Sequence, residues 1–280
     1  MTDPIAVGTD GSPGASRAVR WAADEAALRR RPLHIVHAID RGLYELPLFA
    51  PGQIAESVAE AGEEILTEAA RTAREHRPGI EVTTELVAEA IAVVLADRSR
   101  RAFELVVGHR GRGGFASLLL GSTGLRLAGH TAVPVVIVRG DPASAEGGGE
   151  VVAGIDLVSD PGGILRYAFD AASVRGARVR VLHAWRDGGA DLPAAAVVEK
   201  LEQEVVRAQA PVRGDFPDVE VVADIVRDHP VTALREASRG AALVVVGAHD
   251  HNWLNVPGLG SVSHGVIHHA HSPVAVVQSG

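Results

Sequence analysis

The chain has 280 residues and a formal net charge of −8 at pH 7, with 46% apolar and 22% charged residues. These values are ordinary for a globular protein with a buried core, and they argue against long disordered regions and against a general nucleic-acid-binding protein. Because the sequence contains no cysteine, disulfides, thiol catalysis and cysteine-ligated metal sites are excluded.

The N-terminal residues MTDPIAVGTD lack a basic segment followed by an apolar one. Elsewhere no apolar run approaches the roughly 18 residues that a membrane span needs. We therefore expect a cytoplasmic protein with neither a membrane nor a nucleic acid as its partner.

Short apolar strands alternate with helical segments along the first half of the chain. The expected strands are residues 4–8, 33–39, 80–87, 105–107 and 133–138. The expected helices, with apolar residues at helical spacing, are residues 16–30, 54–76 and 90–101, and residues 41–53 form a loop rich in Pro and Gly. This alternation predicts right-handed βαβ crossovers and an α/β fold with a parallel sheet covered on both faces.

The same plan begins again after a polar, glycine-rich segment. Matching residues lie 146 positions apart early in the repeat, as for Asp10 and Asp156, and 139 apart later, as for Gly108 and Gly247. The second copy has therefore lost about seven residues after its second strand, and a duplicated domain is the simplest explanation.

This duplication predicts two tandem domains, residues 1–140 and 151–280, joined by a linker at residues 141–150. Two packed copies would form an intramolecular pseudo-dimer. The strand at 133–138 is an edge in such a fold, so pairing with a second chain in a homodimer is left open.

A glycine-rich segment follows the fourth expected strand, and it carries the strongest functional signal. Two gaps, of two and nine residues, separate Gly108, Gly111 and Gly121, and two hydroxyl residues then precede a helical pattern. Glycines allow a phosphate to approach the backbone, and a hydroxyl at a helix start adds a donor beside free N–H groups and the helix dipole. The predicted phosphate-binding residues are Gly108, Arg110, Gly111, Arg112, Gly113, Gly121, Ser122 and Thr123.

Together these features resemble the universal stress proteins, in their tandem two-domain form. The resemblance rests on TDGSP at 9–13, IVHAID at 35–40 and VVGHRGRGGFASLLLGST at 106–123, and it covers nearly the whole chain. It implies two open, Rossmann-like domains, each with a five-stranded parallel sheet and helices on both faces. It also implies ATP, together with Mg²⁺, outside the carboxyl ends of the strands.

Carried over to single residues, the resemblance puts Asp10 and the backbone of Ala38 near the adenine and ribose, and the phosphates on the glycine-rich loop. The predicted nucleotide-binding set in the turn after the first strand is Gly8, Thr9, Asp10, Gly11 and Ser12. A simpler role for Asp10 is an Asx-type turn or a helix cap. One departure from the family is Glu89-Ala90-Ile91, where a Gly-x-Pro sequence is common.

The second copy departs more strongly from the motif. Gly247 and Gly260-Ser261 keep their spacing, but Asp250 replaces Gly111. A carboxylate about 4 Å from a phosphate costs roughly 4 kcal/mol at an effective dielectric near 20, or about a thousandfold in affinity. We therefore predict a weak or lost ATP site in the second copy, unless a cation bridges Asp250 to the phosphates. Other replacements are His249 and His251 for the two arginines, and Leu157-Val158 for Gly11-Ser12.

Alternative interpretations of the loop carry less support. A dinucleotide fingerprint, Gly111-x-Gly113-x-x-Ala116, belongs after a first strand and needs an acidic residue about 20 positions later, which is missing here. The sequence has no Gly-Lys pair and therefore no Walker A loop.

Neither catalytic nor metal-binding residues are predicted. In the apolar strands, His37 and His183 suit hydrogen-bonded structural roles, and the spacing of His264 and His268 could bind zinc but lacks an obvious third ligand. The favoured function is an ATP-binding regulator of the stress response. The alternatives are a slow Mg²⁺-dependent ATPase or nucleotidyl-transfer enzyme, and a nucleotide-free interaction module.

Overall fold

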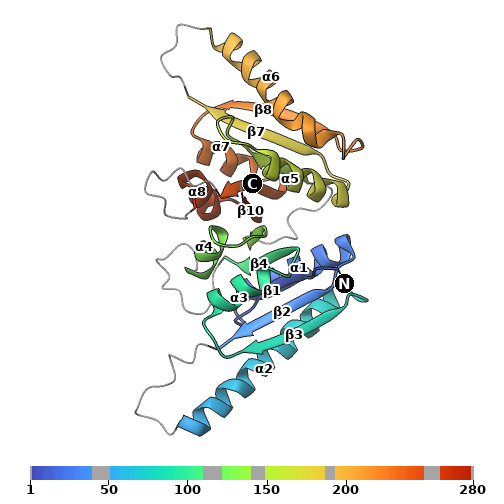
Figure 1. Ribbon diagram of the computed structural model, residues 1–280, viewed down its shortest axis with the longest axis vertical. Coiled ribbons are helices and arrows are strands. Elements are labelled where there is room, and N and C mark those ends of the chain that lie inside the picture. Colours follow the sequence, from blue (N-terminus) through green and yellow to red (C-terminus); the bar gives the residue numbers. More distant parts are fainter. Residues whose placement is uncertain are drawn as a thin grey trace. The chain divides into compact units, whose positions relative to one another are not determined.

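A computed structural model describes residues 2–39, 51–109, 122–139, 149–186, 193–248 and 259–278. The chain separates into two compact units, Met1–Val138 and Arg139–Gly280, whose elements are labelled in Figure 1. Each unit repeats an alternation of strands and helices, as the sequence predicts.

The first unit contains a parallel sheet with the strand order β3-β2-β1-β4-β5. Its elements are β1 (Ile5–Gly8), α1 (Pro13–Arg29), β2 (Leu33–Ala38), α2 (Pro51–His76), β3 (Val82–Val87), α3 (Ile91–Ser99), β4 (Glu104–Gly108), α4 (Ser122–Ala128) and β5 (Val135–Val138).

The second unit has the same topology, with the strand order β10-β9-β6-β7-β8 and parallel pairing. Its elements are β6 (Glu150–Gly154), α5 (Gly162–Arg175), β7 (Val179–Trp185), α6 (Ala194–Arg213), β8 (Val221–Arg227), α7 (Pro230–Ala237), β9 (Ala241–Ala248), α8 (Ser261–His269) and β10 (Val274–Gln278). β6 thus begins at the last residue of the predicted linker.

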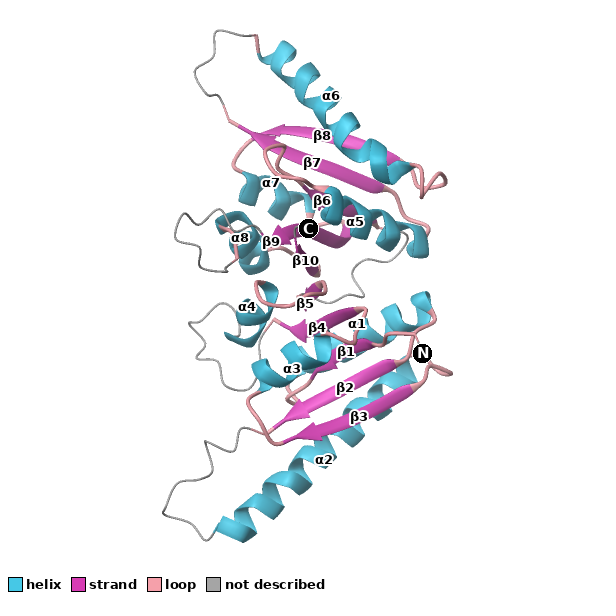
Figure 2. Cartoon of the chain, in the orientation of Figure 1, coloured by secondary structure: helices cyan, strands magenta, loops and turns pink. Residues whose placement is uncertain are grey.

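Helices cover both faces of each sheet. In the first unit α1 packs against α2, and α3 packs against α4. β2 and β3 lie in front of α2 in Figure 2, whereas α3 lies in front of the strands. The second unit repeats these pairs with α5 against α6 and α7 against α8.

The central strands are buried at successive positions. Side chains of Ile5, Ala6 and Val7 in β1 are at most 1% exposed, and Leu105 and Val106 in β4 are fully buried. A strand that is covered on both faces needs apolar residues at successive positions. For this reason the sequence shows these strands as short apolar runs and not as an alternation of apolar and polar residues.

Helix starts differ from the sequence-based expectation. α1 begins at Pro13, three residues before the predicted start, because Ser12 caps the helix and proline suits its first position. α2 begins at Pro51, inside the predicted loop at 41–53. Proline and glycine indicated a loop there, but a proline in the first turn loses no helical hydrogen bond.

A charged cluster ties the edge strand β3 to its neighbours. The carboxylate of Glu85 accepts hydrogen bonds from Arg98 of α3, with Nη2–Oε1 2.6 Å and Nε–Oε2 2.8 Å. His34 of β2 lies 3.0 Å from the same carboxylate through Nε2. The hydrogen bonds from Arg98, and then that from His34, lower the pKa of Glu85 to about 2.

A Glu85→Gln variant should therefore lose stability in a pH-dependent way. Since the folded-state pKa of Glu85 lies below its ordinary value of 4.5, the carboxylate stabilises the fold above that pH, and the contribution is lost as pH falls toward about 2. Urea unfolding at pH 6 and pH 3 checks this, with exposed Glu63→Gln as the control. If Glu85→Gln lost the same unfolding free energy at both pH values, the loss would come from the changed shape of the side chain and not from its charge.

Candidate nucleotide site

Three strand ends meet at one edge of the first sheet. β1 lies between β2 and β4, with Gly8 opposite Val36 and Val7 opposite Val106. Because the strands are parallel, their carboxyl ends lie at the same edge. The structure thus brings the predicted residues Gly8, Ala38 and Gly108 to this edge.

The turn after β1 is held by its own polar side chains. The amide of Ser12 donates to Oδ1 of Asp10 at 3.0 Å, which is the Asx-type turn. Oγ of Ser12 in turn accepts from the amide of Ala15 at 3.2 Å and caps α1. Gly11 has φ of 73°, in the left-handed region that favours glycine, and its amide donates to Oγ1 of Thr9 at 3.3 Å.

His37 links this turn to β2. Its Nδ1 lies 2.7 Å from the carbonyl oxygen of Thr9, and since a carbonyl can only accept, Nδ1 carries the hydrogen. In the second unit, Nδ1 of His183 makes the same bond to the carbonyl of Ile155 at 3.1 Å. Both histidines are half-buried, and this bond is the structural role that the sequence indicated.

Gly108 ends β4 directly against the start of α1. A Cβ at this position would lie 2.7 Å from the carbonyl oxygen of Gly14 and 3.0 Å from the amide of Ala15. Both contacts are with backbone atoms, so no side-chain rotation relieves them. Glycine is therefore required here for the close approach of β4 to α1, independently of any ligand.

Most of the predicted phosphate loop lies outside the described residues: Arg110, Gly111, Arg112, Gly113 and Gly121. Ser122 and Thr123 are the first residues of α4, which places them at a helix start as the sequence predicted. Asp250, His249 and His251 of the second copy also lie outside the described residues.

A cavity of about 260 Å³ occupies the equivalent edge of the second unit. It is lined by the ends of β6, β7 and β9 and by the first residues of α7 and α8, among them Asp156, His183, Gly247 and Ser261. Oγ of Ser263 donates to the carbonyl of Gly247 at 2.5 Å, which fixes the start of α8 against β9. The second copy thus keeps an open space at the strand ends.

The turn before α5 differs from its counterpart. Oδ1 of Asp156 accepts from the amides of Val158 at 3.1 Å and Ser159 at 2.8 Å. Leu157 replaces the left-handed Gly11 and has no positive φ. α5 starts at Gly162 without a side-chain cap, three residues later than the repeat predicts from Pro13. Loss of the glycine and of the capping serine explains the shorter helix.

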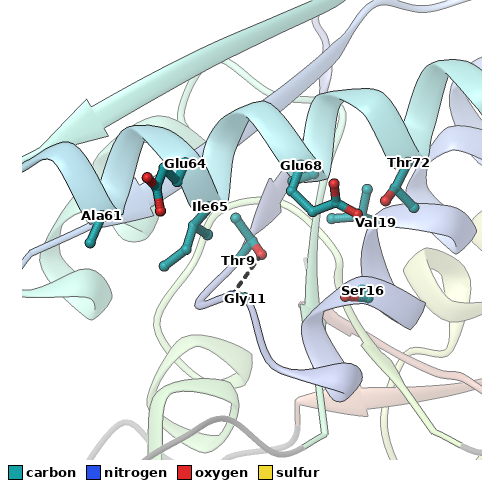
Figure 3. A pocket seen from close by; sticks show the side chains of 10 residues that line it. Thr9, Gly11, Ser16, Val19, Ala61, Glu64, Ile65, Glu68 and Thr72 are labelled. Atoms are coloured by element: carbon teal, nitrogen blue, oxygen red, sulfur yellow. Dashed lines mark hydrogen bonds between the residues drawn. The ribbon is translucent and has the colours of Figure 1, made fainter.

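Sequence reasoning missed a second cavity, of about 310 Å³, between α1 and α2. Figure 3 shows Thr9 and Gly11 from the turn facing side chains of α2. Its polar residues on α2 are Glu64, Glu68 and Thr72, each one helical turn from the next. That spacing was the available sequence signal.

Histidines on α8 form no complete metal site within the described part of the chain. The rings of His264 and His268 have centroids 4.5 Å apart. Both ring nitrogens of His268 are buried without a hydrogen-bond partner in that part of the chain. Burial, and then the proximity of His264, lowers the pKa of His268. No group of three potential His, Asp or Glu ligands occurs among the described residues.

Comparison with known proteins decides the family. The model of the universal stress protein family matches twice, at residues 1–139 and 149–278. The chain belongs to the universal stress protein family. A universal stress protein from Mycolicibacterium smegmatis is 36% identical over 287 residues, which cover 98% of this chain and 96% of the relative. Another from Mycobacterium tuberculosis is 33% identical over 299 residues and covers 98% and 94%.

A solved structure shows the same fold. The crystal structure of a universal stress protein from Archaeoglobus fulgidus superimposes with a TM-score of 0.74 at 21% identity, covering 100% of this chain and 97% of that chain. The tandem arrangement predicted from the sequence is therefore shown, and so is the α/β class with parallel sheets. In the described part of this universal stress protein, no helix has the length and apolarity of a membrane span.

Proposed function

We propose that this universal stress protein is an ATP-binding regulator of the stress response, with a competent site in its first copy and a weak or lost one in its second. The observation that carries the proposal is the meeting of Gly8, the Asp10 turn, Ala38 and Gly108 at one sheet edge. In the sequence, the glycine-rich segment stands between β4 and α4.

The ligand would lie across the three strand ends. Asp10 and the backbone of Ala38 would contact the adenine and ribose, and Gly108 to Thr123 would hold the phosphates with Mg²⁺. The half-exposed Asp10 at the strand end and the space at the matching edge of the second unit both support this placement. Arg110 and Arg112 would add positive charge beside the phosphates.

Binding without turnover is the expected activity. A Walker A lysine is missing from the sequence, and this lysine helps to neutralise the phosphates in fast phosphoryl transfer. His37 donates a hydrogen bond from Nδ1 to the carbonyl of Thr9. This contact holds the turn after β1 in place and is a structural one. Occupancy by ATP would then act on how the protein meets its partners.

Calorimetry on nucleotide-stripped protein tests the proposal. We expect heat from ATP in the presence of Mg²⁺, and phosphate release no higher than that of a Gly111→Asp variant. If no heat were released at millimolar ATP, the proposal of ATP binding would be wrong, and a nucleotide-free interaction module would be the remaining function. Phosphate release far above that of the Gly111→Asp variant would instead favour the slow Mg²⁺-dependent ATPase or nucleotidyl-transfer enzyme.

A further inference from the structure

The cavity between α1 and α2 lies on the other side of the turn after β1 from the α3 and α4 pair, and it shares Thr9 and Gly11 with the candidate nucleotide site. It is lined by Thr9, Gly11 and Ser16 on one side and by α2 on the other (Figure 3). α3 and α4 form the other helix pair of the unit, and the cavity of the second unit lies beside their counterparts α7 and α8. The two candidate sites therefore share only the turn after β1.

Charge at the cavity is negative. Glu64 and Glu68 line it, and no lysine or arginine is among its lining residues. Hydrogen bonds to Glu68 from Arg71, which is not among the lining residues, and from Thr72 lower the pKa of that carboxyl. Glu64 is an exposed residue of α2. Arg71 pairs with both Glu68 and Glu75, each at 2.6 Å, so this cluster together with Glu64 keeps a surplus of carboxylates. Carboxylates one helical turn apart favour a ligand with more than one positive charge.

Hydroxyl groups of Thr9 and Ser16 also line the cavity. Thr9 is 5% exposed, and its Oγ1 accepts from the amide of Gly11. Among the described residues, its hydroxyl donates no hydrogen bond of its own, so the hydrogen is available toward the cavity. Oγ of Ser16 donates to the carbonyl of Ser12 at 3.2 Å, so its lone pairs remain to accept. A ligand oxygen beside Thr9 would accept that hydrogen.

Alkyl side chains complete the walls. Val19 is fully buried and Ala69 is 8% exposed, and the floor also includes Ile65. A volume of about 310 Å³ is far more than the roughly 30 Å³ of one water molecule. A bare metal ion would leave most of the space unfilled, whereas a small organic molecule matches both the volume and the mixed lining.

We propose that this cavity binds a small hydroxylated diamine, with ammonium groups on Glu64 and Glu68 and a hydroxyl group on Thr9. The phosphates of a nucleotide would be repelled by the same carboxylates. This site goes beyond the proposed ATP function and does not depend on it.

The second copy provides an internal comparison. Its α6 aligns with α2 at the offset of 139, which pairs the buried Leu66 with Val205 and Ala73 with Val212. At the cavity positions the two carboxylates and the hydroxyl groups are lost. The replacements are Ile155 for Thr9, Leu157 for Gly11, Gly162 for Ser16, Gln203 for Glu64, Arg207 for Glu68 and Pro211 for Thr72. One amine site per chain is therefore expected.

The test uses diaminopropanol and its analogue diaminopropane, which lacks the hydroxyl group. Calorimetry on the full chain, without nucleotide and at physiological salt, should show one site that prefers diaminopropanol. Glu64→Gln with Glu68→Gln should weaken binding about tenfold or more. Glu60→Gln with Glu63→Gln makes the same charge change on exposed residues of α2 that do not line the cavity, and it should leave affinity unchanged.

Thr9 is tested by the choice between the two ligands. Thr9→Val should remove the preference for diaminopropanol, and Thr9→Ser should restore it. The proposed site would be wrong if neither amine bound. It would also be wrong if the Glu64/Glu68 and Glu60/Glu63 double variants lost the same affinity. Since no nucleotide is present, such a failure leaves the ATP proposal untouched, and loss of ATP binding would leave this one untouched.

Discussion

The Gly111→Asp variant is expected to lose ATP affinity by about a thousandfold. The substitution places in the first copy the carboxylate that Asp250 provides in the second. At about 4 Å from a phosphate, that charge costs roughly 4 kcal/mol at an effective dielectric near 20. Calorimetric titration of nucleotide-stripped protein with ATP measures the change.

Gly240→Asp is the matched control, because it adds the same charge at an exposed position where a Cβ meets no atom within 4 Å. It should bind ATP like the unmodified chain. The reverse exchange, Asp250→Gly, should strengthen any binding by the second copy. An affinity of Gly111→Asp within a few-fold of the unmodified chain would contradict the placement of the phosphates on this loop.

Gly108→Ala should be the most damaging small substitution at the sheet edge. Its Cβ would lie 2.7 Å from the carbonyl oxygen of Gly14 and 2.8 Å from the carbonyl carbon. Since backbone atoms form this contact, β4 and the first turn of α1 must move apart. Overpacking of this kind costs about 1–3 kcal/mol in the free energy of unfolding. Urea unfolding measures the loss.

Gly124→Ala is the control for this substitution. A Cβ at Gly124 would meet Val107 at 3.6 Å and Ile137 at 3.8 Å, which are ordinary contacts. Alanine also favours the helix by up to about 1 kcal/mol over glycine, so stability should hold or rise. If Gly108→Ala were as stable as Gly124→Ala, the tight approach of β4 to α1 would be wrong.

Much of the fold could be predicted because its signals are local. Buried strands such as Ile5–Gly8 are apolar at successive positions, and the repeat offset fixes the second copy from the first. Helix starts were less accurate, since capping by Ser12 and the proline at position 51 act before the apolar periodicity begins. The shortened α5 follows from the replacement of Gly11 and Ser12 by Leu157 and Val158, which leaves the turn around Asp156 without a side-chain cap for the helix.

The sequence predicted a binding site only where all of its residues lie in one continuous segment. The glycine spacing around Gly108 indicated a phosphate loop within a single stretch of chain. The cavity beside Thr9 depends instead on packing between α1 and α2, which brings Glu64 and Glu68 to a turn more than 50 residues earlier. Such long-range contacts are set by the core, so sequence spacing alone did not reveal them.

Counting bound nucleotides per chain tests the central claim, one competent site beside one altered site. Native mass spectrometry of stripped protein titrated with ATP and Mg²⁺ gives this number directly. We expect a single ATP per chain at saturation, and none in the Gly111→Asp variant over the same range. Two equal sites, or a single site that survives Gly111→Asp, would contradict the account.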